Sequence, residues 1–134
     1  MTMQFLVNID VPDLAAAQAL YTRAFGLELG RRLGDGALEL LGAAAPIYLL
    51  HNPPGSVAAA KSPRDYGRHW TPLHLDVVVE HLEPALARAL GAGMVQEDEL
   101  RETNWGRIVR LADPFGHGWC LLQFVGRGYD EITT

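Results

Sequence analysis

The sequence is poor in cysteine and in basic residues, and each shortage excludes a class of protein. Cys120 is the only cysteine among 134 residues, so no intrachain disulfide can form and the chain is compatible with a reducing compartment. Lysine and arginine together number 11 against 16 acidic residues, which gives a net charge of −5. The basic residues are dispersed, whereas a nucleic-acid-binding domain normally shows a basic stripe, so we expect no nucleic-acid partner.

Long apolar segments are missing as well. No stretch reaches the roughly 18 uninterrupted apolar residues that a membrane helix needs, and the opening MTMQFLVNIDVPD lacks the basic start and apolar core of a secretion signal. We therefore expect a cytoplasmic protein with no membrane partner. The sequence also lacks a Gly-rich phosphate loop, a GxSxG elbow, an HExxH pair and a CxxC pair, so it carries none of these common catalytic signatures.

The sequence does contain an internal repeat, in which one order of predicted strands and helix occurs twice. The first copy opens with FLVNIDV (5–11), whose alternation predicts a strand with one strongly apolar face that includes Phe5. Asp13 is suited to cap the N-terminus of an amphipathic helix, and Gly26 is suited to end it. Three further strands are expected in glycine-separated runs at 27–33, 37–41 and 46–51. The predicted order is β-α-β-β-β.

The second copy repeats this order. It predicts a strand at 72–79, a helix at 81–90 with Gly91 at its end, and strands at 94–100, 105–111 and 118–125. The copies align when LVNIDVPDL (6–14) is laid over HLDVVVEHL (74–82) and IYLLHN (47–52) over WCLLQF (119–124), with the second helix about one turn shorter. The proline- and glycine-rich segment between the copies is interpreted as a linker, with a lid over a site as the alternative.

A doubled βαβββ unit resembles the vicinal oxygen chelate superfamily, which includes glyoxalase I, extradiol dioxygenases and bleomycin-resistance proteins. The motifs that carry the resemblance are FLVNIDVPDL leading into ALYTRAFGLELG, and LADPFGHGWCLLQF, which looks like the superfamily's DPxG turn and final strand. The resemblance implies an α+β fold of two tandem βαβββ modules whose curved mixed sheets form a cup. It implies one domain, 1–134, with modules at about 4–52 and about 70–126 and a linker at 53–69.

Many members of the superfamily hold a divalent metal in the cup, and the four matching positions in this sequence are Leu6, Tyr48, His74 and Cys120. The resemblance implies His or Gln, Glu, His and Glu at these places, so only His74 matches. Leucine has no donor atom, and tyrosine ligates poorly unless ionised, with a reference pKa near 10. Histidine plus cysteine supplies two protein ligands where catalytic zinc normally has three. We therefore predict no metal and no other cofactor.

Alternation then selects the residues that would face the cup: Leu6, Asn8, Asp10, Tyr48, Leu50, His74, Asp76, Val78, Cys120 and Leu122. A few polar groups with apolar walls are typical of a small-molecule site. The predicted ligand-binding residues are Asn8, Tyr48, His74, Asp76 and Cys120, with Trp70 and Trp105 as stacking walls near the rim. His74 is also the candidate catalytic residue, because imidazole exchanges a proton near neutral pH. The arginines of the pairs Arg31/Arg32 and Arg107/Arg110 are interpreted most simply as solvated strand faces, with one arginine of each pair facing the cup and binding an anion as the alternative.

Each candidate has a structural alternative. His74 can be a hydrogen-bonded core histidine, and Asn8 and Asp76 can hydrogen-bond only across adjacent strands. Cys120 can be a small buried hydrophobe, and the two tryptophans can be packing residues. His117 follows the DPFG turn, where we expect it in solvent.

Three functions are compatible with these residues. The first is a metal-independent small-molecule binding protein of the bleomycin-resistance type, with its ligand in the cup between the two modules. The second is an enzyme: a lyase, isomerase or dioxygenase with an atypical metal site, or a metal-free catalyst that uses His74. The third is a structural or regulatory dimer. Members of the superfamily commonly dimerise, and the short edge strands need a partner or protection, so we predict a homodimer.

Overall fold

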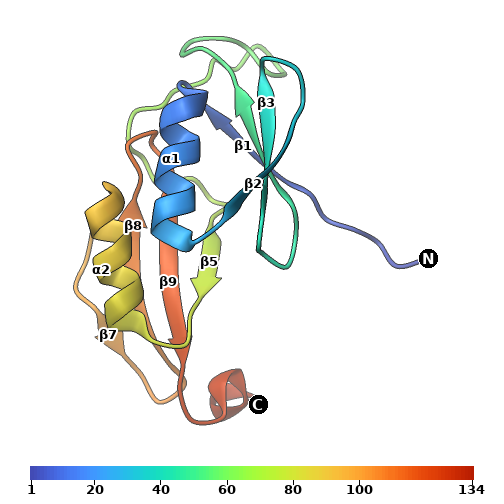
Figure 1. The fold of residues 1–134 in the computed structure, drawn as a ribbon. Helices are drawn as coiled ribbons and strands as arrows, with labels where there is room; N and C mark the ends of the chain where they lie inside the picture. Colours follow the sequence, from blue (N-terminus) through green and yellow to red (C-terminus); the bar gives the residue numbers. More distant parts are fainter. The chain divides into compact units, whose positions relative to one another are not determined.

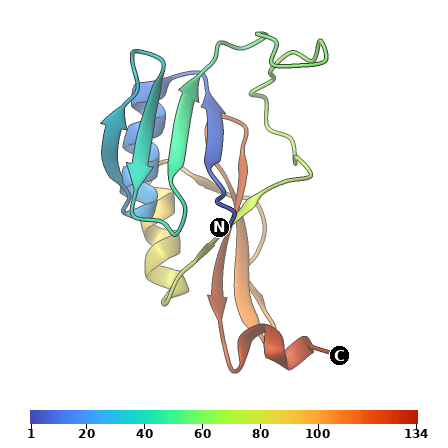
Figure 2. The same ribbon diagram turned by 90° about the vertical axis from the view of Figure 1, so that its right-hand side faces the viewer.

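The computed structural model describes residues 1–134 and divides into two compact units, Met1–Tyr66 and Gly67–Thr134. Each unit contains one helix and one mixed sheet, which confirms the α+β class. The arrangement of elements in each unit is visible in Figure 1 and Figure 2. Neither helix is long and apolar enough to cross a membrane.

The first unit has the predicted β-α-β-β-β order. Its elements are β1 (Val7–Val11), α1 (Leu14–Phe25), β2 (Glu28–Arg32), β3 (Ala37–Leu41) and β4 (Ile47–His51). The sheet order is β1-β4-β3-β2, with β1 parallel to β4 and the other pairs antiparallel. Helix α1 lies along one face of this sheet (Figure 2). The core between them is formed by fully buried side chains that include Val11, Tyr21, Leu38, Leu40 and Leu49.

Both ends of α1 are set by the residues that the sequence indicated. The carboxylate of Asp13 accepts a hydrogen bond from the backbone N–H of Ala16 at 3.0 Å, which satisfies one of the free donors of the first turn. Gly26 ends the helix in the left-handed region, with φ 69°, and its N–H donates to the carbonyl of Thr22. The helix is therefore capped by residues of its own segment.

The second unit repeats the order, except that two short strands stand in place of one and a 3-10 helix follows the last strand. Its elements are β5 (Leu75–Val78), α2 (Leu82–Ala92), β6 (Val95–Gln96), β7 (Arg101–Glu102), β8 (Gly106–Ala112), β9 (Gly118–Phe124) and the 3-10 helix η1 (Gly128–Ile132). The sheet order is β5-β9-β8-β6, β7 also pairs with β8, and β5 is parallel to β9. Helix α2 packs against β9. Its first N–H, from Leu82, donates to the side-chain oxygen of Gln123 on β9.

The internal repeat is confirmed residue by residue. Val7 and Leu75 begin matching strands, and Leu14 and Leu82 begin matching helices. Asn8 lies beside Tyr48 in the parallel pair of the first unit, and Asp76 lies beside Cys120 in that of the second. The alignment of the two copies therefore has the correct register.

Helix α2 is longer than predicted. It runs through Gly91 to Ala92 and ends at Gly93, whose φ of 118° suits glycine. The N–H of Gly93 bonds to the carbonyls of Ala89 and Leu90, so this is the glycine that closes the last turn. With 11 residues against 12 in α1, the second helix is one residue shorter and not one turn shorter.

The predicted strand at 94–100 is wrong as a single element, and the second unit has two short strands in its place, β6 and β7. The reason is Asp98, whose carboxylate accepts the backbone N–H of Arg110 at 2.9 Å. A side chain thus takes the place of a ladder carbonyl, and the strand is interrupted there. The expected start of the first strand also differs, since β1 begins at Val7 and Phe5 is 76% exposed.

Candidate functional site

Equivalent rows of residues cross the two sheets. In the first unit the strand register places Asn8, Tyr48 and Glu39 side by side on β1, β4 and β3. In the second unit it places Asp76, Cys120 and Arg110 side by side on β5, β9 and β8. Neighbours in register point their side chains to the same face of a sheet, so each row is one polar line. Tyr48 and Cys120 hold equivalent central positions, but Glu39 at the end of the first row corresponds to Arg110 at the end of the second.

The row of the first unit is internally paired. Glu39 is 5% exposed, and both of its oxygens accept hydrogen bonds from the Arg31 guanidinium, at 3.1 and 2.8 Å. The Tyr48 hydroxyl donates to the same carboxylate at 3.1 Å. These bonds, chiefly those from Arg31, lower the pKa of Glu39 to about 2. Gly30 leaves the space, because a Cβ there would lie 2.6 Å from a Glu39 oxygen.

The lowered pKa of Glu39 predicts a pH dependence of stability. Because the folded pKa is about 2 and the usual value is 4.5, this carboxylate stabilises the fold above about pH 4.5 and loses that contribution as the pH falls toward 2. The variant Glu39→Gln should therefore be less stable than the parent at pH 6, and the difference should shrink between pH 4.5 and 2. Denaturant unfolding at stepped pH measures it, and a gap that stays constant down to pH 2 would contradict it.

Asp10, expected to face the cup, holds the linker to β1. Its carboxylate accepts hydrogen bonds from Arg64 at 2.7 Å and from the Asn52 amide at 2.9 Å. The Tyr66 hydroxyl donates to the carbonyl of Asn52, and burial raises the pKa of Tyr66. Asn8 lies on the same strand face and is exposed. This end of the linker is therefore anchored to the strand by side chains.

The row of the second unit begins with a cluster of three ionisable groups. His74 lies just before β5, and its Nε2 is 3.2 Å from a carboxylate oxygen of Asp76. The ligating atoms of His74, Asp76 and Cys120 all lie within 4.8 Å of one another. Cys120 is 3% exposed, and burial together with the charge and hydrogen bonding of Asp76 raises the pKa of its thiol to about 11. The thiol therefore keeps its proton at neutral pH.

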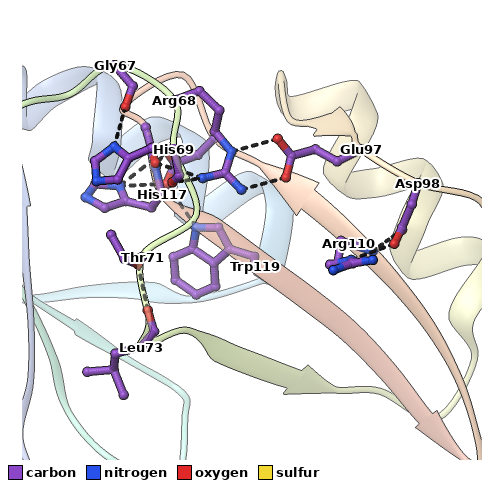
Figure 3. Close-up of polar contacts among 12 residues, drawn as sticks. Gly67, Arg68, His69, Thr71, Leu73, Glu97, Asp98, Arg110, His117 and Trp119 are labelled. Carbon is purple, nitrogen blue, oxygen red and sulfur yellow. Dashed lines mark hydrogen bonds and ion pairs between the residues drawn. The ribbon is translucent and has the colours of Figure 1, made fainter.

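A groove of about 420 Å³ lies at the other end of this row, lined by Arg68, His69, Trp70, Glu97, Asp98 and Arg110. Two ion pairs form its walls (Figure 3): Arg68 binds both oxygens of Glu97 at 2.6 Å, and Nε of Arg110 binds Asp98 at 2.6 Å. Arg68 lowers the pKa of Glu97, so this carboxylate is ionised.

Trp70 forms the aromatic part of the groove. Its ring lies 5.4 Å from the guanidinium carbon of Arg68, 5.8 Å from that of Arg110, and 4.9 Å from the ring of His74. Gly118, at the start of β9, makes this possible, because a Cβ there would lie 2.4 Å from the indole. The indole remains 42% exposed. Trp70 thus connects the groove to the three-residue cluster.

Trp105 occupies a different place. It packs with Phe124 and Tyr129, with ring centroids 6.5 and 5.1 Å away, at the opposite end of β9 from Gly118. The structure therefore brings together His74, Asp76, Cys120 and Trp70 among the predicted ligand-binding residues of this unit, and it does not bring Trp105 to them.

The turn that leads into β9 is fixed by a buried carboxylate. The side chain of Asp113 is 0% exposed and accepts hydrogen bonds from the backbone of Phe115 and His117 and from the Trp119 indole, all at 2.9 to 3.0 Å. The His117 ring is 2.9 Å from the same carboxylate and is 29% exposed. The expectation of a solvated His117 is therefore wrong, because the Asp113 carboxylate holds the ring against the turn.

The comparison with protein families decides the identity of the fold. The model of a glyoxalase-like domain matches residues 6–122. The chain belongs to this family. Among curated proteins, the glyoxalase-like chain is 35% identical to the uncharacterized protein Rv0887c of Mycobacterium tuberculosis over 135 residues, which cover 95% of this chain and 78% of the relative.

Solved structures agree on the architecture. TioX from Micromonospora sp. ML1 superposes with a TM-score of 0.71 at 18% identity, covering 92% of this chain and 100% of TioX. The fosfomycin resistance protein FosX from Listeria monocytogenes superposes with a TM-score of 0.70 at 17% identity, covering 92% of this chain and 93% of FosX. Identities at this level establish the glyoxalase/bleomycin-resistance fold and nothing finer.

The metal of the wider superfamily does not fit the residues present at its positions. Leu6 has no donor atom and is exposed, and the hydroxyl of Tyr48 already donates a hydrogen bond to Glu39. In the second unit Asp76 adds a third donor to the two, His74 and Cys120, that lie at the superfamily's metal positions. An ion there would first have to displace the Cys120 proton, and a pKa near 11 makes that costly.

Four residues of these networks were missed from sequence: Glu39, Arg68, Glu97 and Asp98. Glu39 stands inside the apolar run ALELL, where a single charged residue in a buried strand was the available signal. Arg68 lies in the linker and pairs with Glu97, 29 positions later. No local pattern marks such a pair.

Proposed function

We propose that this glyoxalase-like protein binds a small molecule on the face of the second unit, without a metal. The observation that carries the proposal is the continuous line from His74, Asp76 and Cys120 to Trp70 and Arg110, which ends in an open groove of about 420 Å³. That volume lies within the usual range for ligand sites, and the groove combines an exposed indole with fixed polar groups. Two structural neighbours, a glyoxalase/bleomycin resistance protein/dioxygenase from Nocardioides and the fosfomycin resistance protein FosX, are named for resistance to small molecules, which supports such a role.

The second candidate is an enzyme that uses His74 in acid–base chemistry, as a lyase, isomerase or dioxygenase of atypical kind. One contact favours it. The 3.2 Å separation between Nε2 of His74 and Asp76 is the arrangement in which a carboxylate orients an imidazole and leaves its other nitrogen for a substrate. The two candidates share the site and differ only in whether the bound molecule is changed.

The expected partners follow from the same features. We propose a small molecule as the ligand, a homodimer as the assembly and the cytoplasm as the location, with neither nucleic acid nor membrane as a partner. Strands β1 and β5 are each at the edge of their sheet, so each has an unpaired side that invites pairing with another chain.

A screen of aromatic antibiotics and small α-keto compounds by thermal shift tests the proposal. A compound bound at 100 times its Kd should stabilise the fold by about 2.7 kcal/mol, which is readily seen as a rise in Tm. Elemental analysis of untagged protein and product analysis of each bound compound complete the test. If the protein contains a stoichiometric divalent metal and ligand binding requires it, the metal-free proposal is overturned. If a bound compound is turned over, the enzyme is the correct candidate.

A further inference from the structure

The arginines of these networks differ in how completely they are paired. Arg31 uses its Nε and Nη2 on Glu39, and Arg107 binds Glu83, Glu102 and Gln123 through Nε and both terminal nitrogens. Arg68 bonds Glu97 through Nε and Nη2 and backbone carbonyls through Nη1. Each of these guanidinium groups is a structural tie.

Arg110 is different. Its Nε donates to Asp98 at 2.6 Å, while its two terminal nitrogens donate no hydrogen bond within the protein. The side chain is 47% exposed and lines the groove beside Trp70. Asp98 therefore fixes one edge of the guanidinium and leaves the outer edge open. That edge presents parallel N–H donors, the arrangement that binds a carboxylate through two hydrogen bonds.

The surroundings favour a flat ligand. The indole of Trp70 lies 5.8 Å from the Arg110 guanidinium carbon, so a planar anion bound to Arg110 would have an aromatic wall beside it. Glu97 is paired with Arg68, and Asp98 is paired with Nε of Arg110, on the edge of the guanidinium away from its two terminal nitrogens. The ring of His74, 4.9 Å from the Trp70 ring, offers a further polar group beside the indole.

We propose that the groove binds a small aromatic carboxylate, with the carboxylate held by the two terminal nitrogens of Arg110 and the ring against Trp70. This inference rests on the proposed function and adds the chemical class of the ligand. The equivalent position in the first unit, Glu39, has the opposite charge and is fully paired, so we assign the anion site to the second unit alone.

Calorimetric titration with 2-naphthoate and its uncharged carboxamide tests the inference. The parent protein should bind the carboxylate at least about tenfold more tightly than the amide, since the amide cannot accept a charge-assisted pair of hydrogen bonds. Arg110→Gln should abolish that preference, and Arg110→Lys, which keeps the charge and loses the flat fork, should retain part of it. Thermal unfolding checks that both variants are folded.

Arg101→Gln is the matched control. It removes the same charge from β7, the neighbour of β8, but Arg101 does not line the groove. This variant should keep the preference for the carboxylate, and equal loss in both variants would mean that general electrostatics and not Arg110 binds the anion. If neutral aromatic compounds bind the parent and 2-naphthoate does not, the inference fails while the proposed function stands. If no compound in either experiment binds, the proposed function fails as well.

Discussion

Asp113→Ala should destabilise the protein by about 3 to 5 kcal/mol, the largest effect expected of a single substitution here. The carboxylate is fully buried, and its removal takes away the acceptor of hydrogen bonds from the backbone N–H groups of Phe115 and His117 and from the Trp119 indole. Each unsatisfied buried donor costs about 1 to 3 kcal/mol. Urea unfolding followed by circular dichroism measures the loss.

The control for this substitution is Asp35→Ala, which removes an exposed carboxylate from the turn between β2 and β3. Its stability should stay within about 0.5 kcal/mol of the parent. Asp113→Asn, which keeps the shape and turns one acceptor into a donor, should lie between the two. A loss below about 1 kcal/mol for Asp113→Ala would show that the turn does not depend on this carboxylate.

Gly118→Ala should remove ligand binding in the groove while leaving the rest of the fold in place. An added Cβ would lie 2.4 and 2.7 Å from two carbons of the Trp70 ring and 2.8 Å from Nη2 of Arg68, so the indole has to move. Overpacking of this kind typically costs about 1 to 3 kcal/mol. Urea unfolding gives that loss, and titration with the compounds that bind the parent gives the change in affinity.

Gly36→Ala provides the comparison, because a Cβ added at Gly36 would have no atom within 4 Å and the φ of Gly36 is not positive. This variant should match the parent in both stability and affinity. If Gly118→Ala also binds as the parent does, Trp70 is not part of the ligand site.

The fold could be predicted in detail because its signals are local and occur twice. The strand at FLVNIDV and the cap at Asp13 depend on residues within a few positions of one another, and the same local pattern returns when Leu6–Leu14 is laid over His74–Leu82. The prediction erred at 94–100, where the decisive contact is between Asp98 and Arg110, 12 positions apart. Spacing along the chain does not encode which carboxylate will replace a ladder carbonyl.

The candidate site could be predicted only in its central row. Strand alternation, applied to the superfamily alignment, was enough to place Asp76 and Cys120 on one face of their sheet and Asn8 and Tyr48 on one face of theirs, because register fixes the face. The partners at the ends of the rows, Glu39 and Arg110, come from strands whose pairing the repeat did not specify. The shared cavity between the modules, the ligand and the assembly stay predictions.

The cap of α2 also has a consequence for the time course of folding. Helix α1 takes its cap from Asp13, three positions from the N–H that it satisfies, whereas His81 makes no side-chain cap and the Leu82 N–H depends on Gln123, 41 positions later. The first turn of α1 can thus be closed as soon as its own segment exists. The first turn of α2 has to wait until β9 is synthesised and paired, because long loops must close before such contacts form. We therefore expect the N-terminal cap of the first helix to form early in synthesis, and that of the second only when almost the whole chain has been made.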